Sequence, residues 1–254
     1  MQDDLKAQHR SIIDRCVQAV YRPYIASGYK GDAPTLTNLQ AEIKRQPEPE
    51  AQELALAAEL FISGSLSIFA QKTNVDQNNR LTSYNILDLG EQLLPMGMLV
   101  ILESIYNRVI QNWRAGRRTW VFVDEFSIFF RYPFATNFFL RMWKQVRKRA
   151  GYMTGITQNV GEMLTSKDAC WMLANSEFLI MLSQSASDRA ALAELLNISD
   201  TQLSYVENAD PGCGLMKFGG AFIPFVNSFP EDTELYKLMT TKPADREQVK
   251  PHGV

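Results

Sequence analysis

The stretch Thr119-Trp-Val-Phe-Val123, followed directly by Asp124-Glu125, decides the fold class of this 254-residue chain. An almost unbroken apolar run of this kind predicts a strand that is covered on both faces, as in a parallel sheet. In α/β proteins, side chains at the carboxyl end of such a strand lie in the crevice where ligands bind. Two adjacent carboxylates at the edge of a core need a cation or hydrogen-bond donors as compensation. The sequence therefore predicts a buried strand with a charged ligand site at its carboxyl end.

The segments around this strand alternate between helix and strand. We expect a long apolar helix over residues 98–113, a helix over 137–150 and a second strand over 152–157. This alternation predicts an α/β sheet. The other elements expected beyond residue 63 are short strands at 66–70, 83–89 and 177–182, a helix closing at 172–175, helices at 187–196 and 200–206, and a β-hairpin of 212–218 with 221–226.

The first 63 residues carry helix signals and no strand signal. An apolar stripe over residues 5–20 predicts a helix that Pro23 closes. Thr37-Asn-Leu-Gln40 has capping-box spacing and predicts the start of a short helix. Residues 50–62 are rich in strong helix formers. The expected domains are an all-helical subdomain at 1–63 and an α/β core at 64–254 that ends in a β-hairpin and a helix.

The formal net charge of −2 conceals a local asymmetry. Residues 1–104 carry −4 and residues 152–254 carry −6, whereas residues 105–151, the cationic segment, carry +8. The two acids within the cationic segment are Asp124 and Glu125. Such a segment favours a polyanion, either a triphosphate or a nucleic-acid backbone. The plainer interpretations are solvated helix faces, or arginines that pair with the acidic flanking regions.

Cysteine and histidine usage argues against several kinds of site. The three cysteines, Cys16, Cys170 and Cys213, are far apart and form no Cys-x-x-Cys pair, which disfavours a disulfide scaffold or structural zinc and favours a reducing cytoplasm. The histidines, His9 and His252, lie near the termini, so a histidine-based catalytic triad is not expected. No uninterrupted apolar run reaches the ~18 residues of a membrane span, and the N-terminus does not resemble a signal peptide. We therefore expect membrane association only through partners.

Further polar residues are predicted near the carboxylate pair. Adjacent pairing of the two central strands would place Gln158 beside Glu125, where a glutamine can orient a water or sense a γ-phosphate; the alternative is a turn residue that caps the next helix. Arg147-Lys148-Arg149 ends the intervening helix and could neutralise phosphate charge in the same or a neighbouring subunit. The alternative for this triplet is a solvated helix end that complements the helix dipole.

One component of an ordinary nucleotide site is missing. A phosphate-cradling loop needs Gly-x-x-x-x-Gly-Lys-Ser/Thr. The pair Lys72-Thr73 follows Gln71, and Leu66 stands where the first glycine belongs. The sequence therefore has no such loop, and this chain is not expected to bind a nucleotide in the ordinary way by itself.

Taken as a series, several segments resemble the conjugative type IV secretion ATPases, in particular the TrsE/TraE-like members of this HerA–FtsK-type group from mobile elements. The likeness covers most of the chain from about residue 55 onward. It is carried by residues 64–75, 88–90, 120–126, 143–148, 155–159, 173–178, 188–189, 212–215, 229–233 and 235–237. The resemblance implies a partial RecA-like P-loop NTPase sheet that lacks its P-loop strand, with the N-terminal helices matching an insertion of the family.

The resemblance also implies roles for the carboxylate pair and its neighbours. It implies Walker B functions for Asp124, which would bind Mg²⁺, and for Glu125, which would activate the attacking water. Gln158 would act as a sensor, and Thr157 and Gly212 would contact the nucleotide.

Three basic residues are implied as catalytic groups. Arg147 and Lys148 match the family's Arg-Lys pair, and Arg189 is a second candidate for a finger that reaches a neighbour's nucleotide.

The resemblance implies that the parent protein hydrolyses ATP with Mg²⁺ to drive apparatus assembly or DNA and protein transfer. It would lie at the inner face of a bacterial cytoplasmic membrane. Its implied partners are other copies of itself, with a hexamer as one candidate assembly, other type IV secretion subunits and the coupling protein. Because the loop is missing, we expect a truncated or split part of the enzyme that binds neither ATP nor Mg²⁺ tightly and has negligible activity alone. The alternative function is a non-catalytic module that binds DNA or a subunit through the cationic segment.

Overall fold

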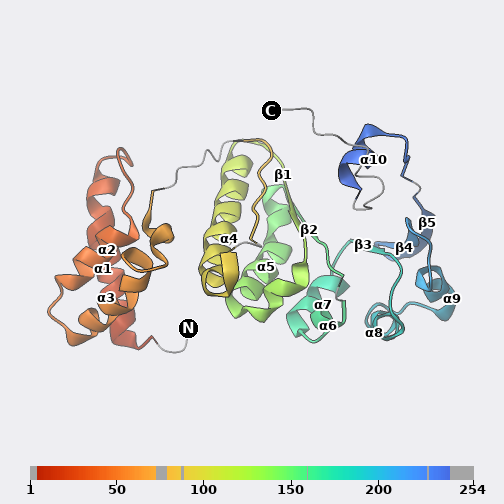
Figure 1. The fold of residues 1–254 in the computed structure, drawn as a ribbon, viewed down its shortest axis with the longest axis horizontal. Coiled ribbons are helices and arrows are strands. Elements are labelled where there is room, and N and C mark those ends of the chain that lie inside the picture. Colours follow the sequence, from red (N-terminus) through yellow and green to blue (C-terminus); the bar gives the residue numbers. More distant parts are fainter. Residues whose placement is uncertain (1–4, 73–78, 87–88, 159, 228, 241–254) are drawn as a thin grey trace. The chain divides into compact units, whose positions relative to one another are not determined.

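The computed structural model describes residues 5–72, 79–86, 89–158, 160–227 and 229–240 (Figure 1). The chain divides into two compact units, Met1–Ile101 and Leu102–Val254. The division falls inside helix α4 (Gly90–Arg114). The presence of α4 confirms the long helix expected over residues 98–113. The domain boundary expected after residue 63 stays a prediction.

The first unit begins with three helices: α1 (Ala7–Ala26), α2 (Leu36–Lys44) and α3 (Pro49–Ile62). Their apolar faces meet in a small core made of Ile12, Cys16, Ile43, Ala51 and Ala55. A buried hydrogen bond of 2.8 Å from the Gln40 side-chain amide to the Ala55 carbonyl joins α2 to α3. The helical character expected for this part of the chain is confirmed.

Two details of these helices differ from expectation. Helix α1 does not close at Pro23 but continues to Ala26, so its last turn accommodates the proline, which lacks a backbone N–H donor. The capping box at the start of α2 is formed by Thr35 and Asn38, not by Thr37 and Gln40. Thr35 has the extended backbone that an N-cap requires, and its N–H donates to the Asn38 side chain at 2.9 Å.

The segment after α3 contains no strand among its described residues. Residues expected as a strand at 66–70 form instead a 3₁₀ helix, η1 (Ser67–Ala70), whose bonds are local, such as Ser67 N–H to the Gly64 carbonyl at 3.1 Å. Residues 83–86 adopt no regular structure, and residues 87–88 of that expected strand lie outside the described residues. Both strand predictions fail for the described positions because a strand needs a partner with which to share backbone hydrogen bonds.

In the second unit, β1 (Thr119–Val123) and β2 (Gly151–Gly155) pair in parallel, with Thr119 opposite Gly151 and Val123 opposite Gly155. Figure 1 shows the two strands side by side, with α5 (Pro133–Gln145) next to them. The 3₁₀ helices η3 (Phe126–Arg131) and η4 (Val146–Arg149) flank α5 in the connection. This crossover confirms the predicted pair of parallel strands.

The prediction that the first strand is covered on both faces is wrong for this chain. Val121 and Val123 are buried, but the side chains that alternate with them lie on an open face, with Trp120 54% and Phe122 67% exposed. Tyr152 of β2 lies on the same open face, its ring stacked on that of Trp120 at a centroid distance of 4.9 Å. The β1–β2 pair therefore has one packed face and one exposed aromatic face.

The remaining elements are α6 (Val160–Leu164), α7 (Lys167–Ala174), β3 (Phe178–Met181), α8 (Ala186–Leu196), α9 (Asp200–Leu203), η5 (Ser204–Val206), β4 (Cys213–Phe218), β5 (Ala221–Val226) and α10 (Glu234–Met239). The hairpin β4–β5 is as predicted, but β3 pairs antiparallel with β4 and not with the parallel strands. Met181 and Leu215 of this second sheet pack on Leu192 and Leu196 of α8. The fold class is thus mixed α/β with two small sheets, and the RecA-like assignment stays a prediction.

Among the described helices, α4 is the one that is long and apolar enough to cross a membrane, by length and composition. A core helix of a soluble protein can meet the same criteria of length and composition. Membrane association through partners stays a prediction.

Candidate functional site

The predicted site lies where β1 and β2 end. The parallel ladder continues beyond the strands, because Ile156 N–H donates to the Val123 carbonyl and Phe126 N–H donates to the Ile156 carbonyl, each at 2.8 Å. These two bonds hold the segment after β1 against the segment after β2. The side-chain amide of Gln158 donates to Oε1 of Glu125 at 3.1 Å. The predicted neighbourhood of Gln158 and Glu125 is confirmed, and their catalytic roles stay predictions.

The backbone at Glu125 is left-handed, with φ 48° and ψ 45°. This region is uncommon for a residue other than glycine, asparagine or aspartate and costs about 1–2 kcal/mol. The carboxylate of Asp124 accepts a hydrogen bond from Glu125 N–H at 2.9 Å, which helps to define the turn. The strained turn sends the chain into η3 and leaves Asp124 exposed and Glu125 half-buried at the sheet edge. Strain of this kind concentrates at functional sites.

Phe126 anchors this turn in the core. Its side chain is 2% exposed and lies in an aromatic cluster, stacked on Trp143 and edge-on to Phe139 and Phe130. A Cβ atom at Gly155 would collide with the Phe126 ring, so glycine is needed at the end of β2 for this close approach. The buried ring therefore opposes the strain at Glu125 and fixes the position of the carboxylate pair.

An ion pair joins the two segments that carry the site. Nε and Nη2 of Arg131, at the end of η3, donate to the same Glu162 carboxylate oxygen of α6 at 2.9 and 2.7 Å. Both side chains are solvent-accessible, so the pair contributes ~0–1 kcal/mol. It nevertheless joins the segment after Glu125 to the helix after Gln158.

The donor set suits Mg²⁺. The hard ion takes oxygen ligands and is commonly held by one or two carboxylates, substrate phosphates and waters. Asp124 and Glu125 offer two adjacent carboxylates, and no cluster of three or more His, Cys, Asp or Glu forms a complete protein cage among the described residues. The residues present therefore fit an ion that a nucleotide shares, which is the arrangement of ATPase sites.

The predicted basic pair is not brought to these carboxylates. Arg147 and Lys148 lie in η4, immediately before β2, whereas Glu125 follows the far end of β1. Each strand has five residues and rises ~3.3 Å per residue, so roughly 15 Å of strand separates the two groups. The topology therefore places this pair at the opposite end of the strands from Glu125, and its catalytic role, in the same or a neighbouring subunit, stays a prediction.

The other predicted residues have local structural roles. Arg189 donates to Glu207 Oε1 at 2.7 Å and to the Gln184 carbonyl at 3.1 Å, and its side chain is 18% exposed. Gly212 has φ 84°, and a Cβ there would collide with the Asn227 carbonyl, so this glycine is required by the hairpin. Thr157 is half-buried beside Gln158 at the sheet edge. Nucleotide contacts by Thr157 and Gly212, and a finger role for Arg189, stay predictions.

Sequence reasoning missed Gly155, Phe126 and the pair Arg131–Glu162. The density of phenylalanine after Glu125 was an available signal for a packed aromatic cluster. The ion pair joins residues 31 positions apart and has no local sequence signal.

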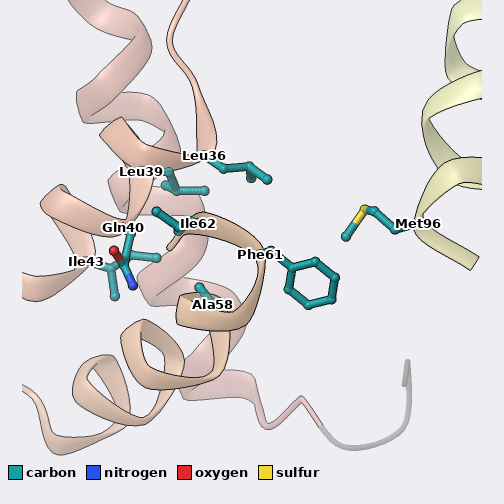
Figure 2. Close-up of a pocket in the computed structure, with 8 residues that line it drawn as sticks. All are labelled: Leu36, Leu39, Gln40, Ile43, Ala58, Phe61, Ile62 and Met96. Carbon is teal, nitrogen blue, oxygen red and sulfur yellow. The ribbon is translucent and has the colours of Figure 1, made fainter. Parts of the chain in front are cut away.

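The first unit contains a hollow that does not match a nucleotide. Figure 2 shows its lining, which includes Phe61 and Ile62 of α3, Leu36 and Leu39 of α2, and Met96. Its volume is about 110 Å³, whereas small-molecule sites occupy ~300–1,000 Å³. The hollow is therefore a packing feature and not the nucleotide site.

Comparisons with known proteins give a match at the level of the fold. No family model matches the sequence, and the search of curated proteins finds no match. Among solved structures, the chain is similar to VirB4 of Thermoanaerobacter pseudethanolicus, with a TM-score of 0.72 and 22% identity over 91% of this chain and 67% of that chain. This likeness confirms, for the fold, the resemblance to type IV secretion ATPases seen in the sequence.

Proposed function

We propose that this chain, which has the VirB4 fold, is the Walker B and sensor part of a type IV secretion ATPase whose phosphate-binding loop is supplied by a polypeptide segment outside these 254 residues. The observation that carries the proposal is the hydrogen bond between Gln158 and Glu125 at the carboxyl edge of parallel strands. This is the edge at which α/β folds bind ligands.

Each site residue has a defined chemical task in this proposal. Asp124, exposed at the sheet edge, would hold Mg²⁺, and the ion would supply charge compensation for the phosphates of the nucleotide. Glu125 polarises the attacking water, and the amide of Gln158 holds its carboxylate in place. Gln158 uses one N–H for this bond, which leaves its second N–H and its Oε1 to orient a water or contact a γ-phosphate.

The open face of the β1–β2 pair supports an incomplete site. Parallel sheets of α/β proteins are covered by helices on both faces. Here Trp120, Phe122 and Tyr152 are exposed on one of them. In the proposal, the segment that brings the phosphate loop covers these aromatic side chains and places the loop beside Asp124 and Glu125.

The partners of the parent enzyme follow from the same proposal. Other copies of the chain, other type IV secretion subunits and the coupling protein would assemble with it at the inner face of the cytoplasmic membrane. Arg147 and Lys148 are better candidates than Arg189 for the basic side chain that reaches the nucleotide of a neighbouring subunit, because the Arg189 side chain already pairs with Glu207.

Phosphate release from ATP tests the proposal. The purified chain should show negligible turnover, because no phosphate loop holds the nucleotide. A fusion of this chain to a segment that carries the Gly-x-x-x-x-Gly-Lys-Ser/Thr loop should bind a fluorescent ATP analogue and turn over ATP. Turnover by the unfused chain that is abolished by Glu125→Gln would contradict the need for a second segment. A folded fusion that binds the analogue without hydrolysing ATP would contradict the proposed catalytic role.

A further inference from the structure

A second charged surface lies at the opposite end of the β1–β2 pair from the carboxylates. Arg117 and Arg118 immediately precede β1, and Arg147, Lys148 and Arg149 immediately precede β2. Because the strands are parallel with Thr119 opposite Gly151, both basic runs lie at the amino edge of the pair. The Thr119 N–H donates to the Ala150 carbonyl at 3.1 Å, which holds the two connections together. We call these five residues the amino-edge surface.

The charges of this surface are not neutralised by carboxylates of the described residues. Elsewhere in the cationic segment, Arg131 forms an ion pair with Glu162. Arg117, Arg118, Arg147 and Lys148 are exposed and take part in no ion pair among the described residues. Within the described part of the chain, these four residues do not pair with the acidic flanking regions.

Packing orients part of the surface before any ligand binds. The guanidinium of Arg149 lies 5.6 Å from the centroid of the Tyr106 ring, and that of Arg141 lies 5.2 Å from the same centroid. The connection before β1 is fixed as well, because Arg117 N–H donates to the Asn112 carbonyl at 2.8 Å. Pre-ordered cations lose less conformational entropy when they bind an anion.

The arrangement favours an extended phosphate polymer. Four of the five side chains are arginines, whose planar guanidinium groups match phosphate oxygens in two-point hydrogen bonds. The cations come from the connection before β1 and from the 3₁₀ helix η4 before β2, so they spread along an edge instead of converging on one phosphate. Membrane-surface binders instead place cations along one amphipathic helix with an apolar opposite face. The dipole of a helix also stabilises cations near its C-terminus, but this stabilisation is limited to the last turn of the helix.

We propose that the amino-edge surface binds the phosphate backbone of nucleic acid without sequence preference. The inference does not need the proposed hydrolytic site, because it uses the end of the strands that is remote from Asp124 and Glu125. Arg147 and Lys148 are also candidates for the finger, so the Arg117 and Arg118 variants separate nucleic-acid binding from the ATPase proposal.

Fluorescence anisotropy of a labelled mixed-sequence oligodeoxynucleotide, titrated with the full chain at several NaCl concentrations, tests this proposal. The parent chain should bind, with affinity that falls steeply as salt rises. The double variant Arg117→Ala/Arg118→Ala and the double variant Arg147→Ala/Lys148→Ala should each weaken binding roughly tenfold and lower the logarithmic salt slope by about 1–2. The charge-preserving variant Arg117→Lys/Arg118→Lys should retain most of the affinity.

The matched control is Arg22→Ala/Lys30→Ala, which removes two exposed cations from the first unit and should leave binding unchanged. Circular dichroism and thermal unfolding establish that each variant is folded, and a misfolded alanine pair is replaced by the glutamine pair. The proposal is overturned by no binding at low salt, or by an equal loss in the control. It is also overturned if the chain sediments with phosphatidylserine vesicles and the oligonucleotide does not compete.

Discussion

The side-chain amide of Gln158 donates a hydrogen bond of 3.1 Å to the carboxylate of Glu125, and the two residues are 33 positions apart in sequence. The bond links the segments that follow two parallel strands. It also sits beside a left-handed turn at Glu125 that the buried Phe126 ring holds in place. The geometry of the candidate site therefore depends on packing as well as on the polar residues themselves.

Gly155→Ala should destabilise the second unit and disturb the site. The new Cβ would collide with the Phe126 ring, and overpacking of this kind costs ~1–3 kcal/mol. Urea unfolding followed by tryptophan fluorescence measures the loss, since Trp143 stacks on Phe126. Gly220→Ala is the matched control, because a Cβ there meets no atom within 4 Å. Equal free energies of unfolding for the two variants would refute the proposed close approach.

The first unit should lose stability in acid through Glu48. The hydrogen bond from Arg15, at 2.6 Å, lowers the pKa of the Glu48 carboxyl below its usual value of ~4.3. A depressed folded pKa means that the stabilisation is present above the usual value and is lost as the pH falls through the folded value. Thermal unfolding between neutral and acidic pH should therefore show a smaller decline in Glu48→Gln than in the parent. The control is Glu59→Gln, an exposed change on α3, whose stability should decline with acid as that of the parent does. If the stability of Glu48→Gln declines as much as that of the parent, the proposed contribution of the Arg15–Glu48 interaction is wrong.

Cys16 should resist alkylation in the folded chain. Its side chain is 0% exposed, and burial raises the pKa of the thiol, so access and thiolate fraction are both low. Iodoacetamide should modify the half-buried Cys170 and Cys213 first, and Cys16 at least about tenfold more slowly. Peptide mass spectrometry after timed quenching measures the three rates, and added urea should accelerate Cys16. Equal rates without urea would show that the helical core is open.

Much of the second unit could be predicted because its signals are local. The apolar run Thr119–Val123 and the strand that follows α5 specify β1 and β2, and neighbouring parallel strands bring Glu125 and Gln158 to one edge. The hairpin β4–β5 was also predictable, since Gly219-Gly220 supplies a tight turn between apolar segments.

The rest depends on tertiary partners that no local pattern reveals. Residues 67–70 have the composition of a strand, but they form local 3₁₀ bonds. The left-handed backbone at Glu125 is imposed by tertiary packing, since glutamate has no intrinsic preference for this conformation. The pairing of β3 with β4, and the remoteness of Arg147 from the carboxylates, follow from topology and not from residue type.

The most direct test of the central claim is the steady-state ATPase rate of the fusion that carries a phosphate loop, with and without Glu125→Gln. The account predicts that this change lowers kcat by about 100-fold or more and leaves the KM for ATP within about twofold, because Glu125 acts on water and not on nucleotide binding. An unchanged kcat in the folded Glu125→Gln fusion would contradict the assignment of Glu125, and with it the proposed hydrolytic site.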